Sequence, residues 1–208
     1  MGELILCSHP IAAMPYYIDN ISLNVYSLEE LCYYIENHLY LIEADFMSEE
    51  LCLWIGQELD EKDLAQSLRS VLLGNGSLSD FTELILRSCG YCSEDTIRHI
   101  RSVLLDMQNK SVFECSKIRA DRYMESEKYV KAIHEYRKLL GMEEECKKNP
   151  VLEGNIRHNL GTACAELFLF DEAAANFLNA YRLNRNRESL AACMAACRLA
   201  KKTDILKT

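Results

Sequence analysis

The chain is poor in the residues that interrupt helices. Its 208 residues include only three prolines and eight glycines. So few helix breakers over this length favour long helices joined by short turns. We therefore expect an all-α fold.

Basic side chains are scarce in the first part of the chain. Residues 1–97 hold three Lys/Arg against seventeen Asp/Glu, a net charge of −14, whereas residues 98–208 have a net charge of +5. The acidic part would repel nucleic acid, and the net charge of +5 on the rest is too small to attract it. We therefore expect no nucleic-acid partner. The charge difference indicates two regions with different surfaces. It is also compatible with a homodimer in which acidic and basic regions associate.

The start of the chain lacks a hydrophobic run long enough for a membrane. Its longest uncharged stretch, residues 4–18, contains Pro10 and Pro15 and is too short to span a bilayer, so we expect no membrane partner.

Ten cysteines are scattered through the sequence, most of them at apolar positions of helical patterns, where a free thiol behaves as a small buried hydrophobe. Without an export signal, reduced thiols in a bacterial-type cytoplasm are the simplest expectation.

The first 26 residues follow a different pattern from the rest. Residues 3–7 form a short apolar run, and residues 21–25 alternate apolar and polar side chains with the period of a half-buried strand. Pro10 and Pro15 lie between them. We expect residues 1–26 to form a small β-hairpin within residues 3–25 or an irregular cover over a helical domain.

Residues 27–110 have the periodicity of an acidic helical region. Ser27 and Glu30 have the spacing of a capping box, in which each side chain accepts a bond from an unpaired backbone N–H. Glycines at positions 74, 76 and 90 can take the left-handed conformation that ends a helix. The pattern predicts five helices, the first extending to Ile42. Their starts are Ser27, Ser48, a position near Asp60, Ser77 or Ser79, and Ser93.

A repeated pattern is clearest from Gly154 to Arg187. The positions that carry it are Leu160, Gly161, Ala173, Phe177 and Ala180. This segment resembles the tetratricopeptide repeat, an antiparallel helix pair of about 34 residues. Small residues in this pattern let paired helices approach closely, and the aromatic residue fills the space beside them.

A looser copy of the same pattern begins at Phe113. Its Ala132 precedes the equivalent Ala173 by 41 residues, and we assign the excess over one period to a longer second helix and a loop within residues 141–150. Residues 188–201 match the first helix of a third repeat and suit a capping helix. The resemblance implies a right-handed superhelix of helix pairs in residues 111–208.

The second copy departs from the family pattern at three positions. Arg157 stands where the family often has Trp, Phe168 stands at the usual turn glycine, and Arg185 stands where proline is common. Phe168 predicts that this turn is tucked against an apolar surface.

The resemblance also implies a concave groove lined by the first helices, which binds a peptide or a partner helix. We therefore expect a protein-binding scaffold or adaptor rather than an enzyme. The positions that would line the groove are Lys117, Asp121, Glu125, Asn155, His158, Asn159, Thr162 and Glu166.

Some members of this family grip the C-terminal carboxylate of heat-shock chaperones. Lys117 and Asn159 match two of the five positions of that clamp, whereas Asp121, Ser189 and Cys193 do not. A carboxylate and a thiol in place of amide and cationic donors would repel a carboxylate ligand. We therefore predict that the chain binds no chaperone tail.

Two alternatives come from other features. Cys89 and Cys92 have the CxxC spacing of zinc and redox sites, with His99 near in sequence and Cys7 and His9 able to approach in space. Because there is no second CxxC, we expect no metal or other cofactor, and we interpret the motif as a helix end with one buried and one partly exposed thiol. A peptide-sensing regulator would need a basic recognition helix, and residues 1–97 are too acidic to supply one.

The N-terminal region is rich in tyrosine. Six of the eleven tyrosines are Tyr16, Tyr17, Tyr26, Tyr33, Tyr34 and Tyr40. Tyrosine is enriched at interfaces because it joins apolar area to a polar tip. These side chains predict either a second interaction surface or the cover of a small core.

Overall fold

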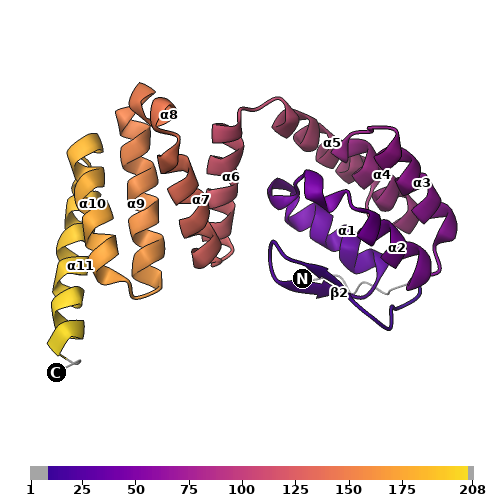
Figure 1. Ribbon diagram of the computed structural model, residues 1–208, viewed down its shortest axis with the longest axis horizontal. Coiled ribbons are helices and arrows are strands. Elements are labelled where there is room, and N and C mark those ends of the chain that lie inside the picture. Colours follow the sequence, from indigo (N-terminus) through magenta and orange to yellow (C-terminus); the bar gives the residue numbers. More distant parts are fainter. Residues whose placement is uncertain (1–8, 206–208) are drawn as a thin grey trace. The chain divides into compact units, whose positions relative to one another are not determined.

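A computed structural model of the chain describes residues 9–205, with side chains up to residue 201. The chain divides into two compact units, Met1–Asn109 and Lys110–Thr208, each with its own internal packing. Within the described residues, helices predominate and the strands are limited to one small two-stranded sheet, so the predicted all-α fold is confirmed (Figure 1). In the same part of the chain, no helix combines the length and apolar character needed to cross a bilayer.

The first unit begins with a β-hairpin. Strand β1 (Tyr16–Ile18) pairs antiparallel with β2 (Leu23–Val25), so that Tyr16 lies opposite Val25. Ile21 and Val25 are buried, as the period-two pattern of residues 21–25 predicts, and Ile18 of the partner strand is buried as well. The partner of β2 is thus Tyr16–Ile18, and the strand predicted over residues 3–7 lies outside the described residues.

Five α-helices complete the first unit. Two short 3₁₀ turns, η1 (Leu39–Leu41) and η2 (Ala44–Phe46), follow the first helix, so that helix ends at Asn37 rather than reaching Ile42. Helix α1 packs on α4, α2 on α3, and α4 on α5. The helices are α1 (Leu28–Asn37), α2 (Glu49–Gln57), α3 (Lys62–Leu73), α4 (Leu78–Cys89) and α5 (Glu94–Gln108).

Serine side chains start four of these helices. The hydroxyl oxygens of Ser27, Ser48, Ser77 and Ser93 each accept a bond from a backbone N–H three residues later. The predicted box at Ser27 is only half formed, because Glu30 accepts from the backbone N–H of Tyr26, at 2.6 Å, instead of that of Ser27. The reciprocal box of α4, by contrast, joins Ser77 and its partner three residues later, Asp80.

Different residues end α3 and α4. Gly90 ends α4 in the left-handed conformation, with φ of 63°, as predicted. After α3 it is Asn75, with φ of 53°, that turns left-handed, and not Gly74. Asparagine tolerates this region because its short side chain bonds locally. Gly76 is needed for space, since a Cβ there would lie 2.5 Å from Cγ1 of Val71.

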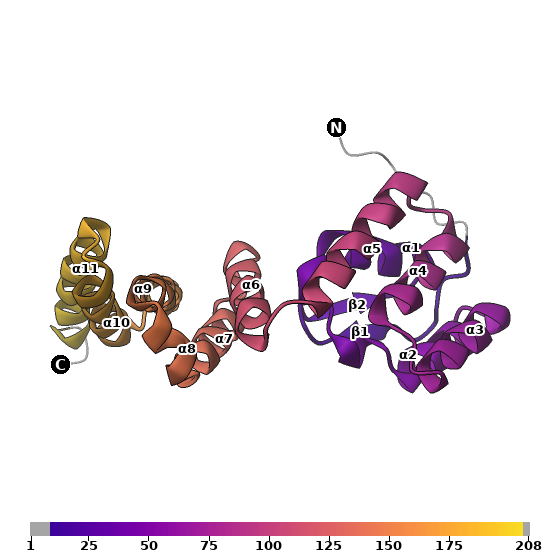
Figure 2. The same ribbon diagram turned by 90° about the horizontal axis from the view of Figure 1, so that it is seen from above.

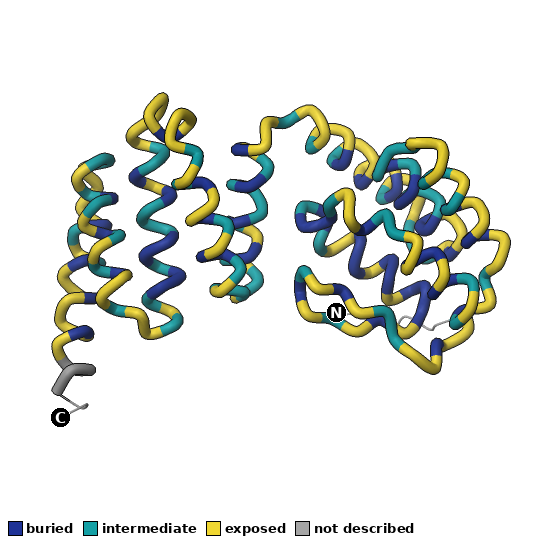
Figure 3. The backbone as a smooth tube through the Cα atoms, in the orientation of Figure 1, coloured by how far each residue is buried: buried dark blue, intermediate teal, exposed yellow. Residues whose placement is uncertain are grey.

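The second unit is a row of packed helices. Helix α6 packs on α7, α7 on α9, α9 on α10, and α10 on α11, with short turns that make neighbours antiparallel (Figures 1 and 2). Buried positions recur along the helices of the unit (Figure 3). The helices are α6 (Val112–Glu125), α7 (Tyr129–Gly141), α8 (Glu143–Lys148), α9 (Pro150–Glu166), α10 (Phe170–Asn184) and α11 (Arg187–Ile205).

Small residues set the distance between α9 and α10. A Cβ added at Gly161 would lie 2.8 Å from Cδ1 of Phe177, and one at Gly154 would lie 2.9 Å from Cβ of Asn184. Ala173 and Ala180 of α10 are fully buried. The expected role of these positions in close helix packing is thus confirmed.

The extra residues between the helix pairs form a helix of their own. Helix α7 ends at Gly141 and is not extended, contrary to the prediction, and α8 follows and packs on both α7 and α9. Cys146 is buried on its inner side. Asn149 caps α9 by accepting from the backbone N–H of Leu152, with Pro150 in the first turn, where its missing N–H costs nothing.

The turn at Phe168 differs from the prediction. Phe168 is 77% exposed, so it is not tucked against an apolar surface, and its ring meets only the edge of Phe170 among the ring contacts described. Its backbone is left-handed, with φ of 61°, as is that of Glu127 in the equivalent turn between α6 and α7, with φ of 58°. The turn geometry of the helix pair requires this conformation whichever residue occupies it.

Candidate functional site

Five of the eight predicted groove residues belong to two clusters, of which the first centres on Asp121. Lys117 donates to Oδ2 of Asp121 at 2.6 Å, and the hydroxyl of Tyr136 donates to Oδ1 at 2.7 Å. The side-chain amide of Asn159 lies 3.4 Å from the same Oδ1 and 3.3 Å from the tyrosine oxygen. Three helices, α6, α7 and α9, are therefore joined by one polar network.

Burial sets the protonation of this network. Tyr136 is fully buried, and this desolvation, with the neighbouring carboxylate of Asp121, raises the pKa of its phenol far above the usual range. The phenol therefore remains a hydrogen-bond donor at neutral pH. Lys117 compensates the charge of Asp121, so the pair offers little net charge to a ligand.

The second cluster joins α9 to α11. Nδ1 of His158 lies 3.0 Å from the hydroxyl oxygen of Ser189, which is fully buried, and the imidazole packs against the ring of Phe177 at 5.2 Å. Thr162, one turn further along α9, donates to the carbonyl of His158 within its own helix. His158 is therefore held in one orientation on this face.

Three predicted residues lie outside both clusters. Asn155 accepts a bond from Asn184 of α10 at 3.1 Å, Glu125 pairs with Arg122 of its own helix, and Glu166 is exposed at the end of α9. The structure adds Tyr136 and Ser189, which were not among the predicted groove residues. A signal for Tyr136 was present, since it occupies the core position equivalent to Phe177 and so brings a hydroxyl into an apolar site.

The CxxC motif lies at the end of α4 in the first unit. Cys89 is buried and Cys92 is partly exposed, which confirms the interpretation of the motif as a helix end with one thiol of each kind. Burial raises the pKa of Cys92 to about 11, whereas a hydrogen bond from the thiol of Cys32 lowers the pKa of Cys89. The two cysteines thus have different environments. His99, near the motif in sequence, is exposed on α5.

Cys89 meets two residues that are distant in the sequence. Its sulfur, an imidazole nitrogen of His9 and a carboxylate oxygen of Glu29 all lie within 4.8 Å of one another. Nδ1 and the backbone nitrogen of His9 lie 2.8 and 3.1 Å from Oε1 of Glu29. Sequence reasoning considered His9 beside Cys7, which lies outside the described residues, and missed Glu29, because its position in the first turn of a helix is explained by the helix dipole alone.

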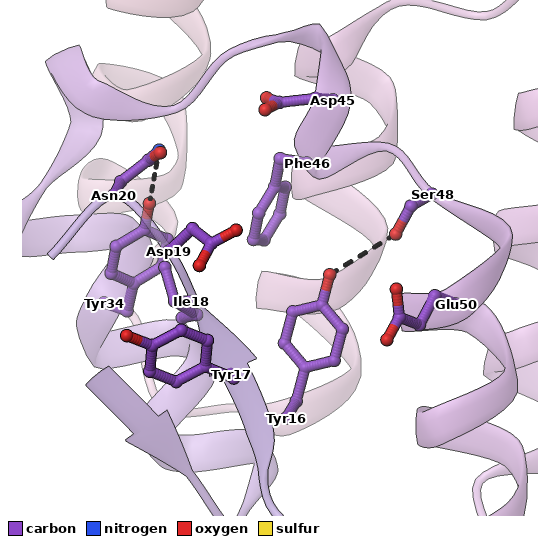
Figure 4. Close-up of a pocket in the computed structure, with 10 residues that line it drawn as sticks. All are labelled: Tyr16, Tyr17, Ile18, Asp19, Asn20, Tyr34, Asp45, Phe46, Ser48 and Glu50. Atoms are coloured by element: carbon purple, nitrogen blue, oxygen red, sulfur yellow. Dashed lines mark hydrogen bonds between the residues drawn. The ribbon is translucent and has the colours of Figure 1, made fainter. Parts of the chain in front are cut away.

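A pocket of about 210 Å³ lies between the hairpin and the start of α2 (Figure 4). Its walls combine aromatic rings with three carboxylates, those of Asp19, Asp45 and Glu50. The hydroxyl of Tyr16 lies 3.4 Å from that of Ser48, and the amide of Asn20 donates to the carbonyl of Leu41 at 2.6 Å. These bonds hold the hairpin against the helices, and the carboxylates give the pocket a negative potential.

The N-terminal tyrosines divide between core and surface. Tyr34 is fully buried and contacts the ring of Phe46, whereas Tyr17 and Tyr33 are about half exposed. Tyr34 therefore belongs to the core, whereas a second interaction surface at the exposed tyrosines stays a prediction.

Comparisons with known proteins add no relative. No family model, curated protein or solved structure matches the chain. The class of the protein rests on its own fold, an all-α chain of two units, the second a row of antiparallel helices with a polar network on its first helices.

Proposed function

We propose that this protein is a binding scaffold or adaptor of the tetratricopeptide type. It would hold a peptide or a partner helix against the first helix of each helix pair in its second unit, namely α6, α9 and α11. The observation that carries the proposal is the pair of clusters on that face. Lys117, Asp121 and Asn159 form one, which joins α6 to α9, and His158 with Ser189 forms the other, which joins α9 to α11.

Pre-ordering of these side chains favours binding. A side chain already held by neighbours loses less conformational entropy when a ligand arrives. Asn159, His158 and Thr162 are only partly buried on α9, so their polar groups remain accessible to the backbone of an extended peptide. Because Lys117 is paired with Asp121, recognition would depend on hydrogen bonds and shape more than on net charge.

The experiment compares wild type with two matched double variants in a crosslinking pulldown from cell extract. The face variant carries Asn159→Ala and Thr162→Arg. The control carries Asn176→Ala and Ala175→Arg on α10, where Ala175 is exposed, so both variants change the same kinds of surface and the same charge. Circular dichroism first establishes that both are folded.

We expect a partner that binds wild type and the control and is lost from the face variant. That partner is then purified and its affinity for all three proteins is measured directly. Equal binding by the face variant, or no partner for wild type, would overturn the proposal.

The charge balance at Asp121 gives a narrower expectation about the ligand. A peptide ending in an acidic tail and a free carboxylate should show no saturable binding, since Asp121 repels it and Lys117 is already paired. Fluorescence anisotropy with a labelled acidic peptide tests this. Binding of about micromolar strength that disappears in Asn159→Ala would contradict it.

A further inference from the structure

Three different metal-ligating groups converge in the first unit. They are the imidazole of His9, the carboxylate of Glu29 in the first turn of α1, and the thiol of Cys89 at the last residue of α4. We propose that they bind a zinc ion, at a site distinct from the face through which the second unit would bind its partner.

The spacing of the donor atoms suits a small tetrahedral ion. Bonds of roughly 2.0–2.3 Å place neighbouring ligand atoms of tetrahedral zinc roughly 3.3–3.8 Å apart. The three donors lie within 4.8 Å of one another, with His9 and Glu29 at 2.8 Å through their hydrogen bond. An ion would replace that bond and draw the sulfur inwards.

Burial and charge favour an ion over an accidental cluster. The side chains of Glu29 and His9 are 5% and 19% exposed, and Cys89 is 9% exposed. A carboxylate in such a poorly solvated place is costly unless positive charge compensates it. A protonated His9 compensates one charge, whereas a divalent cation compensates both the carboxylate and a thiolate.

The donor types select the metal. A set of carboxylates alone would suit magnesium or calcium, but a thiolate with an imidazole is typical of zinc. Cys32, three residues after Glu29 on α1, donates its thiol to the backbone carbonyl of Ile85 at 3.8 Å and is not one of the three converging groups. The three protein ligands would be one thiolate, one imidazole and one carboxylate, and water would complete the tetrahedron of zinc.

The expected role of the ion is structural. His9 lies in the segment before the hairpin, so zinc would tie that segment to α1 and to the end of α4. Trp54 donates its indole N–H to the carbonyl of Met14 at 2.8 Å, so tryptophan fluorescence reports on the same segment. Metal binding would therefore raise the unfolding midpoint followed by fluorescence.

The test uses the full-length protein, freed of metal with a chelator and kept reduced. Elemental analysis before chelation should find one zinc per chain, and titration of Co²⁺ should produce a thiolate-to-cobalt charge-transfer band displaced by Zn²⁺. Cys89→Ser should remove that band and weaken zinc binding more than about tenfold, and His9→Ala should weaken it similarly. Cys92→Ser and His99→Ala are the matched controls and should bind as wild type does.

Two results would overturn the proposal. One is a wild-type protein that binds neither Zn²⁺ nor Co²⁺ at micromolar concentrations. The other is binding that survives in both Cys89→Ser and His9→Ala, or that depends on Cys92 instead. Circular dichroism shows whether each variant folds, and if Cys89→Ser does not fold, the wild-type cobalt band and the effect of His9→Ala decide.

Discussion

At the scale of single residues, Phe168 is a bulky side chain in a conformation that favours glycine. Its φ of 61° is costly for an L-residue, by roughly 1–2 kcal/mol. Because the residue is 77% exposed, burial of its ring contributes little stabilisation to offset that cost. The neighbouring Leu169 is also exposed.

We predict that Phe168→Gly raises the free energy of unfolding by about 0.5–1 kcal/mol, because relief of the left-handed backbone outweighs the greater freedom of glycine in the unfolded chain. Urea denaturation followed by circular dichroism measures the change. Phe168→Ala is the control, since it removes the ring but keeps a Cβ in the left-handed region. A gain of the same size in the alanine variant would show that the ring, and not the backbone, is responsible.

Glu83 gives the first unit a dependence on acid. Its carboxylate accepts a bond from Arg87 at 2.8 Å and another from Arg101 of α5, and the side chain is only 17% exposed. These two cations hold the pKa of Glu83 below its usual value. The stabilisation is complete above the unfolded pKa of about 4.3 and is lost as the pH falls through the lower folded pKa.

We therefore predict that Glu83→Gln is less stable than wild type at pH 6 and that the difference disappears towards about pH 3. Urea denaturation at several pH values, followed by the fluorescence of Trp54 in the same unit, measures it. Stability curves that stay parallel from pH 6 to pH 3 would contradict this assignment.

Residue roles could be predicted where they are local. Ser48 and Ser93 were identified as helix starts because a cap acts on a backbone three residues away. The environment of Phe168 was predicted wrongly, because exposure depends on which neighbours lie over the turn. The meeting of His9 with Cys89 had no local signal, since 80 residues separate them.

At the scale of elements, the packing of α9 on α10 depends on the absence of a side chain at Gly161. A Cβ there would lie under 3 Å from two ring carbons of Phe177, which is itself buried. Gly141, at the exposed end of α7, has nothing within 4 Å of such a Cβ. The two glycines therefore differ in function although both lie in helices.

We predict opposite effects for the same substitution at these positions. Gly161→Ala should cost about 1–3 kcal/mol by overpacking. Gly141→Ala should stabilise the protein by up to about 1 kcal/mol, because alanine is the better helix former. Chemical denaturation followed by circular dichroism measures both, and a stabilising Gly161→Ala would show that the helix pair can separate without loss.

Helix number in the first unit followed from the sequence, but not every boundary did. Five helices were predicted in residues 27–110 and five α-helices are present there. The first ends at Asn37 because η1 and η2 follow, and their apolar residues Leu39 and Phe46 enter the core from 3₁₀ turns. Helix α8 was missed because its six residues are too few for a periodic pattern.

At the scale of the whole molecule, the two units have separate cores and need not unfold together. Trp54, the only tryptophan, belongs to the first unit, whereas both units contribute helices. Fluorescence therefore reports on one unit and far-ultraviolet circular dichroism on both.

We predict that the two signals give non-coincident unfolding curves in urea. Gly161→Ala should shift only the circular dichroism curve, and Glu83→Gln at pH 6 should shift the fluorescence midpoint. A single transition shared by both signals, and moved equally by either variant, would contradict independent unfolding.

The sequence by itself determined the helical class, most helix starts and the repeated pattern of small and aromatic residues after residue 113. These depend on interactions within a few residues or on a periodic pattern, and both are readable in one chain. Only the tertiary structure decided that Tyr136 completes the Asp121 network and that His9, Glu29 and Cys89 meet. Such contacts join segments tens of residues apart, and their geometry follows from how the helices pack, which no local pattern encodes.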